Sequence, residues 1–163
     1  MAGPQGQPVT IIHLQRLTAA NGGLNAPIDD MARYLGFLCG SSDPAVARQY
    51  DAILKRSSLE EMRKPVVPVS DGVSMGLGFF LDRRGGLDIV AHSGGQNGFI
   101  SHFYVHASSR RATIVAFNTQ TTSEKRGDER STRALDSALW QVLIERLFGG
   151  TARPAPPGTT IQQ

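Results

Sequence analysis

The residues with the clearest chemical potential are His92-Ser93-Gly94-Gly95, which directly follow an apolar run from Leu87 to Ala91. The imidazole and the hydroxyl together offer a hydrogen-bond donor, an acceptor and a group that can carry charge. The two glycines have no Cβ, so a substrate or another backbone can approach the main chain closely. We interpret these residues as one wall of a hydrolase site.

The chain around this motif shows the alternation that is typical of β-strands. It predicts an antiparallel meander with strands at 76–82, 87–92, 99–107 and 112–118. The last of these strands is apolar on both faces, a pattern typical of a central, covered strand. Since no further strand follows it, we expect another chain, or a segment outside this one, to pair with its free edge.

Helical periodicity predicts three helices before the meander and one after it. The first starts at Pro27 and ends at Gly40, and the second follows the cap Asp43 over 44–54. A capping box at Ser58 to Glu61 predicts a short third helix that Pro65 stops, followed by a loop over 65–74. The longest apolar stripe, over 131–148, predicts a helix that lies flat on the sheet.

These elements together predict an α+β fold, with the sheet and the final helix as its centre. At 163 residues the chain is long enough for one domain with a real core. We expect a loose segment at 1–18, a helical segment at 19–74, an antiparallel sheet with a packed C-terminal helix at 75–150, and a disordered proline-rich tail at 151–163.

Composition argues against several classes of function. The net charge is +3, from 17 basic and 14 acidic residues. The basic residues occur in short pairs at expected turns, not in the stripe with interleaved aromatics that is typical of a nucleic-acid binder. No apolar run is long enough to span a bilayer. The single cysteine, Cys39, excludes an intrachain disulfide and falls on the apolar side of a predicted helix. We therefore expect neither nucleic acid nor a membrane as partner.

The motif invites two readings that its context disfavours. Ala91-His92-Ser93-Gly94-Gly95 fits a nucleophile elbow, but an elbow requires a helix after the serine, and here the next segment is β-rich. A metal site from His92, His102 and His106 is also disfavoured. His102 and His106 would lie about 13 Å apart on one strand face, too far to share an ion. We expect no metal and no cofactor.

An extended pattern resembles the penicillin-recognising serine hydrolase superfamily, which contains class C β-lactamases, D-alanyl-D-alanine carboxypeptidases and related esterases. The pattern covers roughly residues 19–148. In chain order it comprises Gly22-Gly23-Leu24, Asp30 to Leu35, Gly76 to Phe80, His92-Ser93-Gly94-Gly95, Gly98-Phe99, Phe117-Asn118 and the last amphipathic helix. The His-Ser-Gly tripeptide is similar to the family's Lys-Thr-Gly motif. The resemblance implies the C-terminal half of a β-lactamase/transpeptidase-like fold.

Two motifs on which the family's acyl transfer depends are absent from this sequence. The family uses a serine in Ser-x-x-Lys, assisted by a hydroxyl from a second motif such as Tyr-x-Asn. No serine here precedes lysine by three residues, and no tyrosine fits Tyr-x-Asn. In the family both motifs come before the region matched here. We therefore expect a fragment that is inactive by itself.

The resemblance also implies a role for each residue of the motif. The Gly95 N–H would be one oxyanion-hole donor, an interaction worth about 3 kcal/mol. Ser93 would hydrogen-bond a substrate carbonyl or carboxylate, and Gly94 would leave room for the acyl chain. His92 would orient the hydroxyl of the second motif. Because histidine can be neutral at pH 7, unlike lysine, the resemblance implies a carboxylate-bearing β-lactam less strongly and is compatible with an ester.

A function from another class stays open. The expected free edge of the strand at 112–118 could bind a partner in a non-catalytic binding or assembly module. The two hypotheses differ in partner: a small ester or amide, with the missing N-terminal half, for the hydrolase, and another chain at the edge strand for the module.

Overall fold

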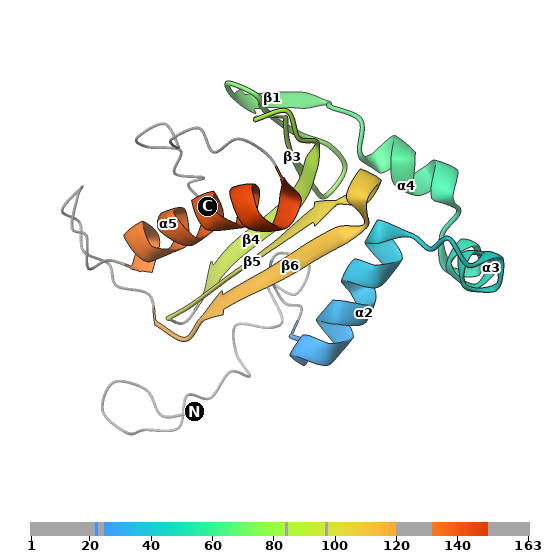
Figure 1. Ribbon diagram of the computed structural model, residues 1–163, viewed down its shortest axis with the longest axis horizontal. Helices are drawn as coiled ribbons and strands as arrows, with labels where there is room; N and C mark the ends of the chain where they lie inside the picture. The colour runs from blue at the N-terminus through green and yellow to red at the C-terminus, as the bar shows by residue number, and fades with distance from the viewer. Residues whose placement is uncertain (1–21, 23–24, 84, 97, 120–131, 150–163) are drawn as a thin grey trace.

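A computed structural model describes residues 22, 25–83, 85–96, 98–119 and 132–149 of the chain (Figure 1). Within these ranges the chain forms four α-helices and one antiparallel sheet of six strands. The predicted α+β fold is confirmed. Expectations for 1–18, 151–163 and most of the loop after Asn118 fall outside the described residues.

The six strands follow one another in the sheet in chain order, from β1 to β6. Each is antiparallel to its neighbour, because each connection is a hairpin or a short turn. The longest pairings join β4 to β5 and β5 to β6. The strand bounds are β1 (Val67–Ser70), β2 (Val73–Met75), β3 (Phe80–Asp82), β4 (Ile89–Gln96), β5 (Phe99–His106) and β6 (Arg111–Phe117).

In the described part of the chain, three helices precede the sheet: α2 (Ile28–Cys39), α3 (Pro44–Ile53) and α4 (Arg56–Met62). Gly40 ends α2 with a φ of 77°, a left-handed value that glycine adopts without strain. Asp43 caps α3, because its Oδ1 accepts the N–H of Ala45 at 2.7 Å. The predicted end of α2 at Gly40 and the predicted cap of α3 are thus confirmed, whereas Pro27 lies at the cap position of α2 and not at its first helical position.

The third helix starts earlier than its sequence predicted. It begins at Arg56, Lys55 occupies the cap position, and no side chain caps it, so the predicted capping box at Ser58 is wrong. The backbone N–H groups of Ser58 and Leu59 donate to the Lys55 carbonyl. The Arg56 N–H donates to the Asp51 carboxylate at 3.1 Å. The free N–H groups at the start of the helix are therefore satisfied by main-chain hydrogen bonds and by a residue of the previous helix, and not by a capping box.

The predicted loop at 65–74 is also wrong, since it contains the β1–β2 hairpin. Every residue of β1 is exposed, so the strand has no buried face and shows no alternation of apolar and polar residues. The predicted strand at 76–82 is shortened to β3. Gly76 and Gly78 instead form a turn in which the Gly76 N–H donates to the Phe79 carbonyl at 2.9 Å.

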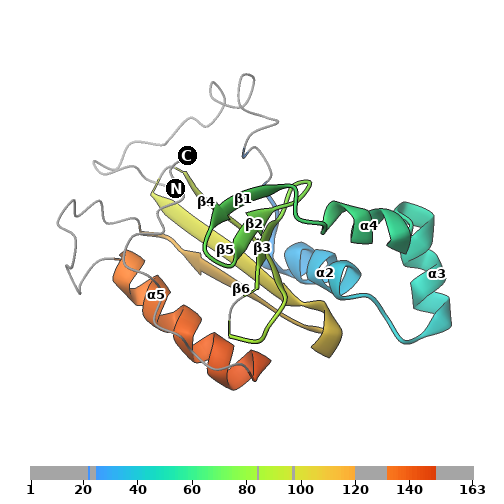
Figure 2. The ribbon, with the colours of Figure 1, turned by 90° about the horizontal axis from the view of Figure 1, so that it is seen from above.

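The sheet is covered on both faces (Figures 1 and 2). On one face, called here the α2 face, Val90 and Val105 pack with Leu35 and Leu38 of α2. On the other, the α5 face, Ile89 packs with a C-terminal helical segment. That segment consists of α5 (Thr132–Leu143) and a π-helical turn, η3 (Ile144–Phe148). The predicted helix on the sheet is confirmed, although its last turn widens.

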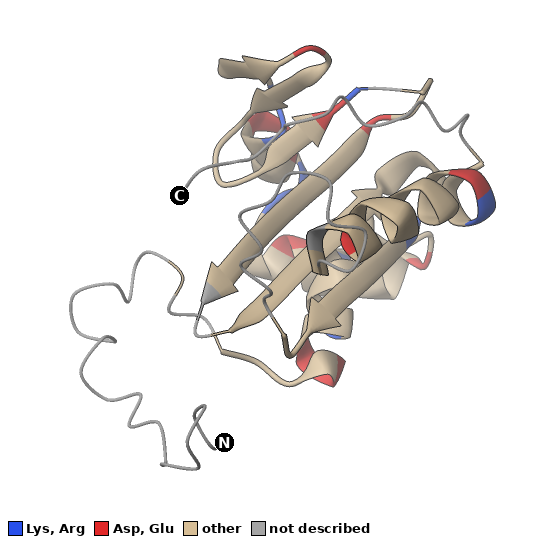
Figure 3. Cartoon of the chain, turned by 90° about the vertical axis from the view of Figure 1, so that its left-hand side faces the viewer, with Lys and Arg blue, Asp and Glu red and all other residues tan. Residues whose placement is uncertain are grey.

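Charged side chains of either sign are spread over the described chain in short stretches (Figure 3). Several pair locally, as Arg33 does with Asp30 and Arg83 with Asp88. Among the residues the structure describes, no helix is both long enough and apolar enough to cross a membrane.

Candidate functional site

The sequence predicted that the strand ends at His92, and this is wrong. The whole His92-Ser93-Gly94-Gly95 motif lies within strand β4. β4 pairs with β5 over its full length, from Val90 with Val105 to Gln96 with Phe99. Gly98 closes the hairpin with a φ of 82°. The continuous ladder to β5 extends the strand past the two glycines.

The other flank of β4 is open along the motif. β3 pairs only with residues 89 to 91 of β4. From His92 to Gln96, no strand of the described chain pairs with that flank. Main-chain polar groups on an open flank are available to a ligand or another segment. The motif therefore presents a bare stretch of backbone.

The two glycines keep this stretch accessible. Gly95 is exposed and Gly94 is partly exposed. A Cβ added to Gly94 would meet no atom within 4 Å, so the space beside it is open. A substrate atom can come within hydrogen-bond distance of this backbone without meeting a side chain.

His92 and Ser93 point to opposite faces of the sheet. His92 pairs with Phe103 on the α2 face, where the two rings stack with centroids 6.3 Å apart. Ser93 pairs with His102 on the α5 face. Because side chains alternate between the two faces of a strand, the imidazole lies on the α2 face beside the open flank and the hydroxyl lies on the α5 face.

An interaction that sequence reasoning missed joins the sheet to α5. The His102 Nε2 lies 3.1 Å from Oδ2 of Asp136, and the two side chains are 14% and 20% exposed. The pair has the distance of an ion pair, but it lacks the alignment of a hydrogen bond. The two-residue hairpin turn places Ser93 opposite His102. This register could have been predicted from the sequence by counting residues outward from the turn. Nothing in the sequence indicates that Asp136 reaches His102.

Tyr104 lies next to this pair and stacks on Trp140 of α5, with ring centroids 4.1 Å apart. Burial raises the pKa of Tyr104 well above its ordinary value, and the negative charges of Asp136 and Asp82 raise it further. The folded state therefore strongly favours the neutral phenol.

This raised pKa makes the stability depend on alkaline pH. A group with a raised folded-state pKa contributes fully below its unfolded value, about pH 10 for tyrosine, and the contribution is lost as the pH rises further. We expect Tyr104→Phe to flatten the alkaline loss of stability. Urea unfolding midpoints between about pH 8 and about pH 12 measure this for both proteins. The same steep loss in the variant would show that Tyr104 is not its source.

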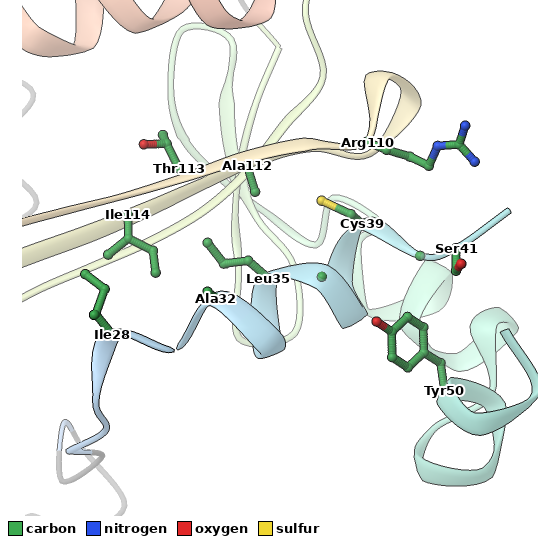
Figure 4. A pocket seen from close by; sticks show the side chains of 12 residues that line it. Ile28, Ala32, Leu35, Cys39, Ser41, Tyr50, Arg110, Ala112, Thr113 and Ile114 are labelled. Carbon is green, nitrogen blue, oxygen red and sulfur yellow. The ribbon is translucent and has the colours of Figure 1, made fainter. Parts of the chain in front are cut away.

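An apolar groove runs between α2 and the last strand (Figure 4). This α2–β6 groove has a volume of about 620 Å³. Ile28, Ala32 and Leu35 of α2 face Ala112 and Ile114 of β6 across it. The other residues that line it are Gly36, Cys39, Gly40, Ser41, Tyr50, Arg110 and Thr113. Burial raises the pKa of the Cys39 thiol, as expected for an unreactive cysteine in an apolar wall.

A family model described as Beta-lactamase matches residues 1–137, well over half of the chain. The chain belongs to the beta-lactamase family. A search of curated proteins gave no match. Family membership agrees with the α+β fold, in which helices lie on both faces of an antiparallel sheet.

The β4–β5 hairpin excludes the nucleophile elbow as an interpretation of the motif. An elbow needs a helix directly after the serine, whereas Ser93 is followed by the β4–β5 hairpin. The three histidines of the metal hypothesis are also separated, because His92 lies on the α2 face and His102 on the α5 face. Within the described ranges, no cluster of three or more His, Cys, Asp and Glu side chains could hold a metal ion.

Proposed function

We propose that this chain is the C-terminal half of a serine hydrolase of the class C β-lactamase, carboxypeptidase or esterase type. It supplies the oxyanion side of an acyl-transfer site for esters or amides. The nucleophilic serine comes from polypeptide outside these 163 residues, which contain neither Ser-x-x-Lys nor Tyr-x-Asn. The observation that carries the proposal is the open flank of β4 from His92 to Gln96.

Each residue of the motif has a role in this proposal. The Gly95 N–H stabilises the oxyanion of the tetrahedral intermediate together with the N–H of the missing serine. Gly94 leaves room for the acyl chain, in agreement with the open space at its Cβ position. Ser93 hydrogen-bonds the substrate from the α5 face. His92 orients the second-motif hydroxyl from the α2 face, on which the preceding helices lie.

The free edge of β6 supports the proposal that a further segment completes the sheet. Among the described strands β6 is terminal, and it has no charged residue after Arg111. Arg111 itself donates to the Leu147 carbonyl at 2.6 Å. The opposite edge, β1, carries Pro68 and an irregular register, two features that protect edge strands from pairing. A strand paired with β6 would place apolar side chains in the α2–β6 groove.

The proposal predicts that activity depends on an added N-terminal half. The DNA directly upstream of Met1 is read for an in-frame Ser-x-x-Lys, and the extended polypeptide is expressed beside the 163-residue chain. We expect the extended protein to hydrolyse p-nitrophenyl esters or nitrocefin, and the shorter chain to show no turnover. Removal of one oxyanion-hole donor lowers kcat about 10²–10³-fold, so loss of the whole serine motif should abolish activity.

A control decides which serine matters. In the extended protein, replacing the Ser-x-x-Lys serine by alanine should abolish turnover, while Ser93→Ala should weaken it by about tenfold, the loss of one hydrogen bond to substrate. Robust hydrolysis by the 163-residue chain that disappears in Ser93→Ala would contradict the proposal, because Ser93 would then be the nucleophile.

The exposed β6 edge also favours a second candidate, a non-catalytic assembly module that binds another chain there. The module predicts a stable dimer by size-exclusion chromatography with light scattering. Ala116→Lys, at an exposed position of β6, should then dissociate the dimer, because an edge lysine opposes strand pairing. Val69→Lys, at an exposed position of β1, is the matched control and should have no effect. A monomer that acquires activity only with the upstream half would exclude the module.

A further inference from the structure

Ser93 has a neighbour on the α5 face that lies beside a carboxylate. Residues in register on antiparallel strands point to the same side, with Cβ atoms about 5 Å apart, and Ser93 is in register with His102. The His102 Nε2 in turn lies 3.1 Å from Oδ2 of Asp136, with little of either side chain exposed. A carboxylate is therefore held one side chain away from the Ser93 hydroxyl.

Two carboxylates act on this side of the site. Asp136 and Asp82 both act on Tyr104, one pair further along β5, and both favour its neutral form. Arg111, which shares this face, lies at the far end of β5 and β6 and bonds the Leu147 carbonyl. Partial burial weakens the screening by water, so a charge here acts over several ångströms.

We propose that Asp136, fixed by His102, makes the Ser93 side of the site select neutral esters and reject substrates with a carboxylate near the scissile bond. This inference rests on the substrate-binding role of Ser93 in the proposed function. A carboxylate bonded to Ser93 would lie within a Debye length of Asp136 and be repelled, whereas a neutral carbonyl would not. Asp136 determines specificity directly, and His102 is a positioning residue because it acts through Asp136.

Two esters that differ by one carboxylate test the proposal on the 163-residue chain itself. Ethyl butyrate and monoethyl succinate are titrated at low salt into ¹⁵N-labelled protein, and the amide signals of Ser93, Gly94 and Gly95 are followed. We expect ethyl butyrate to shift these amide signals at about tenfold lower concentration than monoethyl succinate. The reason is the Coulomb repulsion between the carboxylate of monoethyl succinate and Asp136.

Variants separate the charge from structural effects. Asp136→Asn, which is isosteric, should remove the tenfold difference, whereas Glu145→Gln, at an exposed position of η3, should keep it. His102→Gln should keep most of the difference, because its polar amide can hold Asp136 in place, and His102→Phe should lose it. A purely structural role of His102 would not change the ratio between the two esters.

The proposal would be overturned if both esters shifted the wild-type amide signals equally, or if neither shifted them. A difference that persisted in Asp136→Asn would also overturn it. Hydrolysis by the upstream-extended protein is a separate measurement. If the extended protein showed no activity, the proposed function would be wrong. If the 163-residue chain still discriminated between the esters, the inferred specificity of the Ser93 side would hold.

Discussion

Gly76→Ala is expected to destabilise the fold by about 3 kcal/mol or more, because the added methyl group has no space. Gly76 is buried between the end of α4 and β3. Its Cβ would collide with the Met62 carbonyl oxygen and would lie 3.0 Å from the Lys64 carbonyl oxygen. Both obstacles are main-chain atoms, and the Met62 carbonyl also accepts the Leu77 N–H at 2.9 Å, so they cannot move independently.

The matched control for this prediction is Gly94→Ala. The Cβ at Gly94 meets nothing within 4 Å, and the residue has no left-handed φ. We expect its unfolding free energy to stay within about 0.5 kcal/mol of the wild type. Urea unfolding followed by circular dichroism measures both variants. Equal stability of the two variants would contradict the packing of α4 against the turn before β3.

Gly94→Ala also tests the proposed acyl site. In the upstream-extended enzyme the new methyl group would occupy the space proposed for the acyl chain. Turnover of bulky acyl esters should therefore fall much more than stability does. A variant that keeps full activity would remove Gly94 from the substrate-binding wall.

Leu38→Ala is expected to cost about 3–5 kcal/mol of stability, because it opens a cavity under the sheet. Leu38 is 0% exposed and lies in the core cluster with Leu59, Val90 and Val105. Its carbonyl accepts hydrogen bonds from Arg63 at 2.8 Å and from Arg56 at 3.2 Å, and the substitution leaves these bonds in place. The loss therefore measures side-chain packing between α2 and the α2 face.

Ile53→Ala removes a similar apolar side chain that is 77% exposed and serves as the control. We expect a change within about 0.5 kcal/mol. Both variants are unfolded in urea under the same conditions. If Leu38→Ala lowered the unfolding free energy as little as Ile53→Ala does, the packing of α2 against the sheet would not stabilise the core. The α2 face would then be free to bind other segments.

The local elements of this beta-lactamase family chain could be predicted from its sequence, because they depend on nearby residues. Gly40, Asp43 and Pro44 determine where α2 ends and α3 begins, through backbone freedom and capping. Alternation indicated β5, a run that is apolar on both faces indicated β6, and a long apolar stripe indicated α5. The position of β6 at the edge of the sheet was also predicted, since the chain provides no later strand in the described ranges.

The arrangement of the candidate site was decided by tertiary structure. How far β3 pairs along β4 determines which part of the motif stays open, and the turn at Gly76 and Gly78 shortens β3. The His102–Asp136 pair depends on how α5 sits on the sheet. Sequence patterns report the burial and backbone preference of each residue in its own element. Which elements meet, and in which register, depends on packing between residues far apart in the chain.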